Sequence, residues 1–180
     1  MIELNFDPFP VVETDRLLLR RISTEDAEDI YRLRTNEEAM KYIKKPKLRS
    51  IDDVLELIKV MNSPERIQWG ITIKNENRII GSIGYHRIVK EHYRAEIGYM
   101  LDPSYWKTGV MSEAIEKAID YGFTKMDLHS IEAIIDPENI ASRATLKKFN
   151  FIKEAYYKEN FFFDGEFYDS EVYSLLKANT

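Results

Sequence analysis

The chain has 180 residues, of which 44% are hydrophobic and 32% charged, and its formal net charge is −5. This length and composition are typical of one globular domain with a substantial core, and we expect residues 1–180 to form it. An acidic chain does not provide the basic face that nucleic-acid phosphates require, so we expect no nucleic-acid partner. No run of about 18 apolar residues occurs, which predicts that the chain does not enter a membrane.

Cysteine is absent, which excludes disulfides, cysteine metal sites and a cysteine nucleophile. The three histidines, His86, His92 and His129, show no metal-ligand spacing, and we expect no metal. The first residues lack the basic and apolar regions of a signal peptide. A cytoplasmic location is therefore the expectation.

The first part of the chain predicts an extended lead-in over residues 1–13 and then strands and capped helices. Short apolar or alternating runs are typical of strands, and apolar stripes that follow Ser, Thr or Asn are typical of helices. We predict strands over 16–22, 67–74, 78–89 and 93–101, and helices after Ser23, over 37–43 and after Ser50. The later strands are joined by short polar turns, so they must be antiparallel.

From residue 110 onward, strands and helices alternate. The apolar positions predict a helix over 110–126, a strand over Ser130–Ile135, and a helix over 140–149 with Asn139 as its N-cap. Residues 151–163 and 167–176, around Asp164 and Gly165, predict a final hairpin. A strand–helix–strand crossover makes its two strands parallel, so a mixed α/β sheet is expected.

The loop 105–112 (YWKTGVMS) opens the helix that starts near Val110. The first N–H groups of a helix have no partner inside it, and together with the helix dipole they attract an anion such as a diphosphate. Gly109 lets the backbone approach such a group closely, and Lys107, Thr108 and Ser112 can add a charge and two hydroxyl donors. An ordinary helix start would show the same spacing.

The strand before this loop contains Gly98, and a glycine inside a strand often marks a bulge or a close backbone approach. Free backbone groups there could bind an extended ligand arm or stabilise an oxyanion. Glu96 lies two residues earlier, on the same side of the strand. Its carboxylate is either solvated, paired with Arg87 or Arg94, or a base beside the ligand.

Several segments in this order resemble the GCN5-related N-acetyltransferase (GNAT) superfamily and, within it, the ribosomal-protein-alanine N-acetyltransferase (RimJ/RimL-like) group. The resemblance extends over residues 13–177 and is carried by residues 13–20 (ETDRLLLR), 81–84 (GSIG), 95–99 (AEIGY), 105–114 (YWKTGVMSEA), Asn139-x-x-Ser142 and 146–151 (LKKFNF). It implies an α/β (α+β) fold, in which a twisted, mostly antiparallel sheet of about seven strands carries helices on both faces. It also implies acetyl-coenzyme A as cosubstrate, without a metal.

The resemblance assigns roles to individual residues. Backbone N–H groups of the loop would hold the diphosphate, the strand at Tyr99 would pair with the pantetheine arm, and Ser142 would lie near the thioester sulfur. The cofactor-binding residues implied in this way are Tyr99, Met100, Leu101, Trp106, Lys107, Thr108, Gly109, Val110, Met111, Ser112, Asn139 and Ser142.

This chain departs from the pattern of the group or of the superfamily in four places, one of which is Asn150, in place of a glycine after the short helix. Lys107 and Thr108 stand where glycine and lysine are usual, and Met111 replaces a small residue. Leu146 stands where the superfamily often has a tyrosine acid. The RimJ/RimL-like group often has leucine at this position too, which favours Ser142 as the acid.

Without a cysteine to carry the acetyl group, we expect direct attack by the amine in a ternary complex. An α-amine has a pKa of roughly 8 and must lose its proton to attack, so a base is needed, and Glu96 is the candidate. The N–H near Tyr99 or Met100 would stabilise the oxyanion. Ser142 would protonate or orient the leaving thiolate, or it would only support the helix cap.

The expected acceptor is the α-amine of a protein N-terminus. A small amine such as an aminoglycoside, polyamine or amino acid is the first alternative, and a non-catalytic acyl-coenzyme A-binding protein is the second. An open cleft beside the final hairpin would favour a protein substrate, whereas a closed, acidic pocket would favour a small amine. Exposed sheet edges leave both a monomer and a homodimer open.

Overall fold

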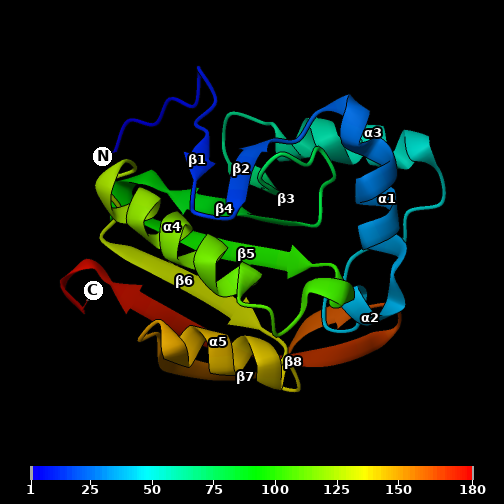
Figure 1. The fold of residues 1–180 in the computed structure, drawn as a ribbon. Coiled ribbons are helices and arrows are strands. Elements are labelled where there is room, and N and C mark those ends of the chain that lie inside the picture. Colours follow the sequence, from blue (N-terminus) through cyan, green and yellow to red (C-terminus); the bar gives the residue numbers. More distant parts are fainter. Residues whose placement is uncertain (1, 180) are drawn as a thin grey trace.

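The computed structural model describes residues 2–179, whose strands form one eight-stranded sheet (Figure 1). The strands are β1 (Val12–Glu13), β2 (Leu17–Arg21), β3 (Ile67–Ile73), β4 (Gly81–Val89), β5 (Arg94–Leu101), β6 (Ser130–Ile135), β7 (Ile152–Phe163) and β8 (Glu166–Leu176). Their order is β1-β2-β3-β4-β5-β6-β8-β7, and only β5 and β6 pair in parallel. The mixed, mostly antiparallel sheet is confirmed. The strand beyond the expected seven is β1, which lies in the predicted lead-in.

Five helices accompany the sheet, and capping residues fix where they begin. They are α1 (Ala27–Thr35), α2 (Glu37–Met40), α3 (Ile51–Met61), α4 (Val110–Thr124) and α5 (Ile140–Lys148). Ser50 and Asn139 each accept the backbone N–H three residues later, as predicted. Helix α4 ends at Thr124 rather than at residue 126, because the chain turns through a positive φ of 50° at Asp127 to enter β6.

The helices cover both faces of the sheet, as expected. Helices α1 and α3 bury one set of apolar side chains on one face, with Ile22 and Ile79 beneath them. Figure 1 shows α4 lying across the opposite face, with α5 on the same side. There α4 buries Ala114, Ile115 and Ala118 in the larger core that contains Trp69.

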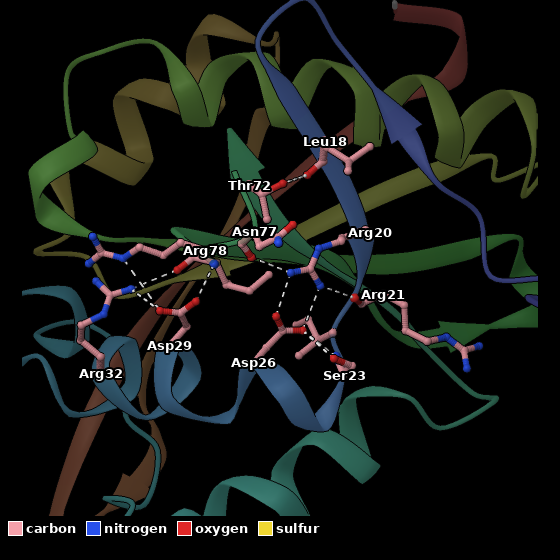
Figure 2. Close-up of polar contacts among 12 residues, drawn as sticks. Leu18, Arg20, Arg21, Ser23, Asp26, Asp29, Arg32, Thr72, Asn77 and Arg78 are labelled. Atoms are coloured by element: carbon pink, nitrogen blue, oxygen red, sulfur yellow. Dashed lines mark hydrogen bonds and ion pairs between the residues drawn. The ribbon is translucent and has the colours of Figure 1, made fainter. Parts of the chain in front are cut away.

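The entry to α1 is held by an ion pair that Figure 2 shows. Arg20 of β2 binds the two carboxylate oxygens of Asp26 at 2.9 and 2.7 Å. Asp26 also accepts the N–H of Ser23 at 2.7 Å, which completes a capping box.

A second polar cluster joins α1 to the chain that follows β5. Asp29 lies between Arg32, at 3.1 Å, and Arg78, at 3.8 Å (Figure 2). The guanidinium of Arg32 also binds Asp102, the first residue after β5. This contact fixes the starting point of the loop that leads into α4.

Candidate functional site

Strands β5 and β6 diverge after a short parallel contact. Their register joins residues 94–96 to residues 130–132, whereas β5 continues to Leu101 and β6 to Ile135. The Tyr93 carbonyl accepts the His129 N–H on the β6 side, and the Asp102 N–H donates at 2.8 Å to the carbonyl of Ile80, the residue before β4. Backbone groups alternate in direction along a strand. The N–H and C=O of Tyr99 therefore face the opening between β5 and β6.

Met100 and Leu101, which follow Tyr99, direct their backbone groups to opposite sides of β5. The Leu101 carbonyl faces the opening and accepts the indole N–H of Trp106 at 3.1 Å. The Trp106 side chain remains 41% exposed. Met100, in contrast, has its backbone directed toward β4, and its side chain packs against the α1–α3 core. Of the two oxyanion donors that the sequence suggested, only Tyr99 presents its N–H to the opening.

The loop before α4 leaves a row of backbone donors at the helix start. Lys107 and Gly109 have positive φ values of 60° and 84°, and Gly109 is the N-cap without a side-chain capping bond. The N–H of Glu113 is the one that bonds to the Gly109 carbonyl, at 3.1 Å. The N–H groups of residues 110–112 therefore precede the intrahelical bonds. Lys107, Thr108 and Gly109 are exposed, so an anion can reach these donors.

The two apolar residues of this first turn face inward. Val110 is buried, and Met111 packs against the main core. The backbone N–H groups of both residues can donate to a ligand, while their side chains pack in the core. The methionine that stands in place of a small residue is accommodated by the core.

An ion-pair clamp that the sequence did not indicate fixes this loop. It is made by Thr14 and Arg16, which precede β2, and by Glu113 of α4. Arg16 Nε and Nη2 each lie 2.7 Å from Glu113 Oε2, and Arg16 Nη1 donates to the Thr108 carbonyl at 3.2 Å. The Thr14 hydroxyl donates to the same carboxylate. Partial burial would raise the pKa of Glu113, but the bonds from Thr14 and Arg16 hold the pKa below its ordinary value. The half-exposed Arg16 adds positive charge beside the helix start.

Tyr99 and Ser142 meet across the opening. Their hydroxyl oxygens are 2.8 Å apart. The Ser142 N–H donates to Asn139 Oδ1 at 3.0 Å, so the Asn139 cap orients the turn that carries Ser142. This use of Oδ1 leaves the Asn139 amide NH2 as the group that can donate to a ligand. Burial raises the pKa of Tyr99 to about 12, and the phenol therefore stays protonated near neutral pH.

Glu96 lies on the opposite face of β5 from Tyr99, because the two residues differ by an odd number of positions. Its side chain is 11% exposed. Oε1 lies 3.0 Å from His86 Nε2, and Oε2 accepts a bond from Arg87 at 3.1 Å. Arg94, the other partner that the sequence suggested, instead lies 3.8 Å from Glu132.

Gly98 does not mark a bulge, contrary to the prediction. It pairs regularly with Gly84, and the irregularity of the β4–β5 ladder lies beyond His86. A Cβ at position 98 would lie 2.8 Å from Cε1 of His86. The glycine therefore provides the space in which the His86 ring lies over the strand and reaches Glu96.

Two further features bear on the kind of chemistry available. Among residues 2–179, the structure contains no group of three His, Asp or Glu side chains arranged to hold a metal ion. Within the same range, each helix is too short or too polar to cross a bilayer.

Comparisons with known proteins give consistent results. A protein-family model described as an acetyltransferase (GNAT) domain matches residues 16–152. The uncharacterized N-acetyltransferase YoaA of Bacillus subtilis (strain 168) is 37% identical over 94% of this chain and 98% of its own length. The uncharacterized N-acetyltransferase p20 of Bacillus licheniformis is 34% identical over 91% and 94%, respectively. A GNAT-family acetyltransferase from Bacillus anthracis superposes with a TM-score of 0.84 at 28% identity, over 94% of this chain and 99% of that chain.

Three other matches name an acceptor. Spermidine N(1)-acetyltransferase of Escherichia coli (strain K12) is 25% identical over 76% of this chain and 73% of its own. Ribosomal-protein-S5-alanine acetyltransferase from Vibrio fischeri superposes with a TM-score of 0.78 at 25% identity, over 93% and 96%. Spermidine N-acetyltransferase from Vibrio cholerae, in complex with CoA and spermine, shares the fold with a TM-score of 0.82 at 24% identity, over 92% and 98%.

Proposed function

Because the chain belongs to the GNAT acetyltransferase family, whose members use acetyl-coenzyme A, we propose that it transfers the acetyl group of acetyl-coenzyme A directly to a primary amine. The observation that carries this proposal is the opening between β5 and β6. It leads from the free N–H groups at the start of α4 to the Tyr99–Ser142 pair. An anion site, an open strand edge and a hydroxyl pair thus follow one another along one gap.

These groups suit the three parts of the cosubstrate. The N–H groups of residues 110–112 and the guanidinium of Arg16 would hold the diphosphate. The C=O of Tyr99 would accept an amide N–H of the pantetheine arm, and the Asn139 NH2 would donate to the arm from the other side. Trp106 would contact the arm with its exposed ring. The thioester supplies the activated acetyl group when it is bound.

Glu96, Tyr99 and Ser142 would supply the proton transfers and the charge stabilisation that the reaction needs. Glu96 would take a proton from the attacking ammonium, directly or through a water molecule, and His86 and Arg87 would hold its carboxylate in place. The Tyr99 N–H would donate to the acetyl oxygen as negative charge develops there. Ser142 Oγ would give its proton to the leaving sulfur, and the protonated phenol of Tyr99 would restore it.

Two classes of acceptor fit this chemistry. The sequence favours the α-amine of a protein N-terminus, and the name of the Vibrio fischeri enzyme gives a ribosomal protein as its acceptor. The name of the Escherichia coli relative gives a small polyamine. In both classes the attacking group is a primary amine that must first be deprotonated.

A thiol-release assay tests the proposal. The chain has no cysteine, so a thiol-reactive dye reports only the coenzyme A that is set free. We expect turnover of acetyl-coenzyme A with at least one member of a panel of peptides and small amines. Glu96→Gln should lower kcat by about a hundredfold, whereas Glu116→Gln, an exposed glutamate on α4, should not.

The outcomes of this assay separate the alternatives. Failure to bind coenzyme A in calorimetry would refute the proposal as a whole. Binding without turnover on any amine would make the protein an acyl-coenzyme A-binding protein. Full activity of Glu96→Gln across the pH range would remove Glu96 as the base while leaving the transfer reaction in place.

A further inference from the structure

The ammonium group of Lys44 lies against the final hairpin, although Lys44 belongs to the basic segment 41–49 between α2 and α3. Its Nζ lies 4.6 Å from the ring centroid of Tyr168 in β8 and 3.9 Å from Asp136 Oδ2 in the turn before α5. It also donates to the Lys41 carbonyl at 3.2 Å. The side chains of Lys44 and Asp136 are 25% and 14% exposed. An aromatic face beside a shielded carboxylate is a binding site for an alkylammonium ion.

The turn that contains Asp136 is bonded to the helix cap of the proposed reaction centre. Asp136 Oδ1 accepts the Glu138 N–H at 2.9 Å, and the Asp136 carbonyl accepts the Asn139 N–H at 2.9 Å. One turn therefore carries both Asp136 and the α5 cap that presents Ser142. Segment 41–49 follows α1 and α2, and Met100, on the same face of β5 as Glu96, packs against the α1–α3 core. Figure 1 shows α2 near the start of β8, at the end toward which β5 and β6 diverge.

The neighbouring part of the hairpin repeats the same arrangement. Lys153 Nζ lies 5.0 Å from the ring centroid of Tyr156 and 2.7 Å from Glu171 Oε1. The side chain of Glu171 is only 6% exposed. Here a tyrosine ring and a carboxylate again share one lysine, and Glu171 is also bound by Arg143 at 3.0 Å. Lys44 differs from Lys153 because it reaches the hairpin from a separate segment.

We propose that Asp136 and the ring of Tyr168 form a subsite for a second ammonium group of the acceptor, and that Lys44 occupies this subsite until a di- or polycationic amine displaces it. The inference rests on the proposed function and names its substrate class. A peptide N-terminus offers one cation at the reacting atom, whereas a di- or polyamine always carries another at its far end.

Matched amines test the subsite. Butylamine and putrescine have the same carbon chain and differ by one ammonium group. We expect kcat/KM for putrescine and for spermidine to exceed that for butylamine by about tenfold, since a shielded cation–aromatic contact contributes on this order. A peptide with N-terminal alanine should be the poorest acceptor.

Variants test the two partners of the subsite separately. Lys44→Gln removes the resident competitor and should lower KM for the polyamines about threefold, with butylamine unchanged. Asp136→Asn retains Oδ1 as acceptor for the turn and should abolish the advantage of putrescine over butylamine, with the KM for acetyl-coenzyme A unchanged. Lys47→Gln is the matched control, because it removes an exposed charge from the same segment.

The results that would overturn the inference are distinct from those that would overturn the transfer reaction. Equal kcat/KM for butylamine and putrescine, or a clear preference for the peptide, refutes the subsite but leaves acetyl transfer intact. A higher polyamine KM in Lys44→Gln refutes displacement, because Lys44 would then be a supporting contact. Coenzyme A release with none of the amines refutes both proposals.

Discussion

The pair of hydroxyl groups formed by Tyr99 and Ser142 can be tested by removing each oxygen in turn. Ser142→Ala leaves the buried phenol of Tyr99 without the partner that lies 2.8 Å away. An unsatisfied buried hydroxyl costs about 1–3 kcal/mol. Tyr99→Phe leaves the smaller hydroxyl of Ser142, whose loss of one bond costs about 1 kcal/mol. The double variant removes both groups, so its destabilisation should be about 1 kcal/mol less than the sum.

Urea unfolding of the four proteins measures this coupling, and kinetics measure the chemistry. If Ser142 protonates the leaving sulfur, Ser142→Ala should lower kcat by about a hundredfold. Tyr99→Phe should have a smaller effect, because the phenol acts on Ser142 and not on the leaving sulfur itself. Retention of kcat within twofold in Ser142→Ala would refute the acid role. Additive destabilisation in the double variant would show that the two hydroxyls are not bonded in solution.

Three other variants test different parts of the molecule. Glu113→Gln releases Arg16 and should raise KM for acetyl-coenzyme A about tenfold, as expected for the loss of one charge-assisted contact. The pKa of Glu113 is lowered in the folded state, so its carboxylate stabilises the protein at pH values above its ordinary pKa of 4.5. This contribution is lost as the pH falls through the folded-state pKa. An unchanged acid-unfolding curve in Glu113→Gln would contradict the clamp. Gly98→Ala places a Cβ 2.8 Å from His86 and should lower kcat, with little change in the KM for acetyl-coenzyme A; wild-type kcat would show that the position of His86 is unimportant. Arg34→Met removes a guanidinium whose pKa burial lowers and whose Nε has no hydrogen-bond partner among residues 2–179. The Tm of Arg34→Met should exceed that of the original protein by about 2–4 °C for each kcal/mol gained in the free energy of unfolding. A lower Tm would contradict this reasoning.

Local signals in the sequence predicted much of the fold. The caps at Ser50 and Asn139 act within three residues of themselves, so the spacing of the sequence contains the whole interaction. Apolar alternation likewise predicted the long strands. Strand β1 was not predicted, because a strand of two residues is too short to show a period. The bulge expected at Gly98 was wrong, because a glycine that makes room for a neighbouring side chain looks the same in sequence as one that marks a bulge.

The contacts that shape the candidate site could not be predicted from the sequence, because they join distant segments. Arg16 and Glu113 are 97 residues apart, and Tyr99 and Ser142 are 43 apart. Neither pair has a spacing that a helix or a strand would impose. Lys44 illustrates the same limit. Its acidic partner, Asp136, lies far along the chain, in the turn before α5.

The divergence of β5 and β6 also has a consequence for the stability of the empty protein. The sheet consists of two leaves, β1–β5 and β6–β8, whose backbones meet through three residue pairs and the bond from the His129 N–H to the Tyr93 carbonyl. Such a seam is a place for partial opening, in which one leaf loosens while the other stays folded. A ligand that occupied the gap as proposed would contact both leaves, and at a hundred times its Kd it would stabilise the folded state by about 2.7 kcal/mol. Slower hydrogen exchange at Tyr99 with coenzyme A present would show that the ligand holds the two leaves of the protein together.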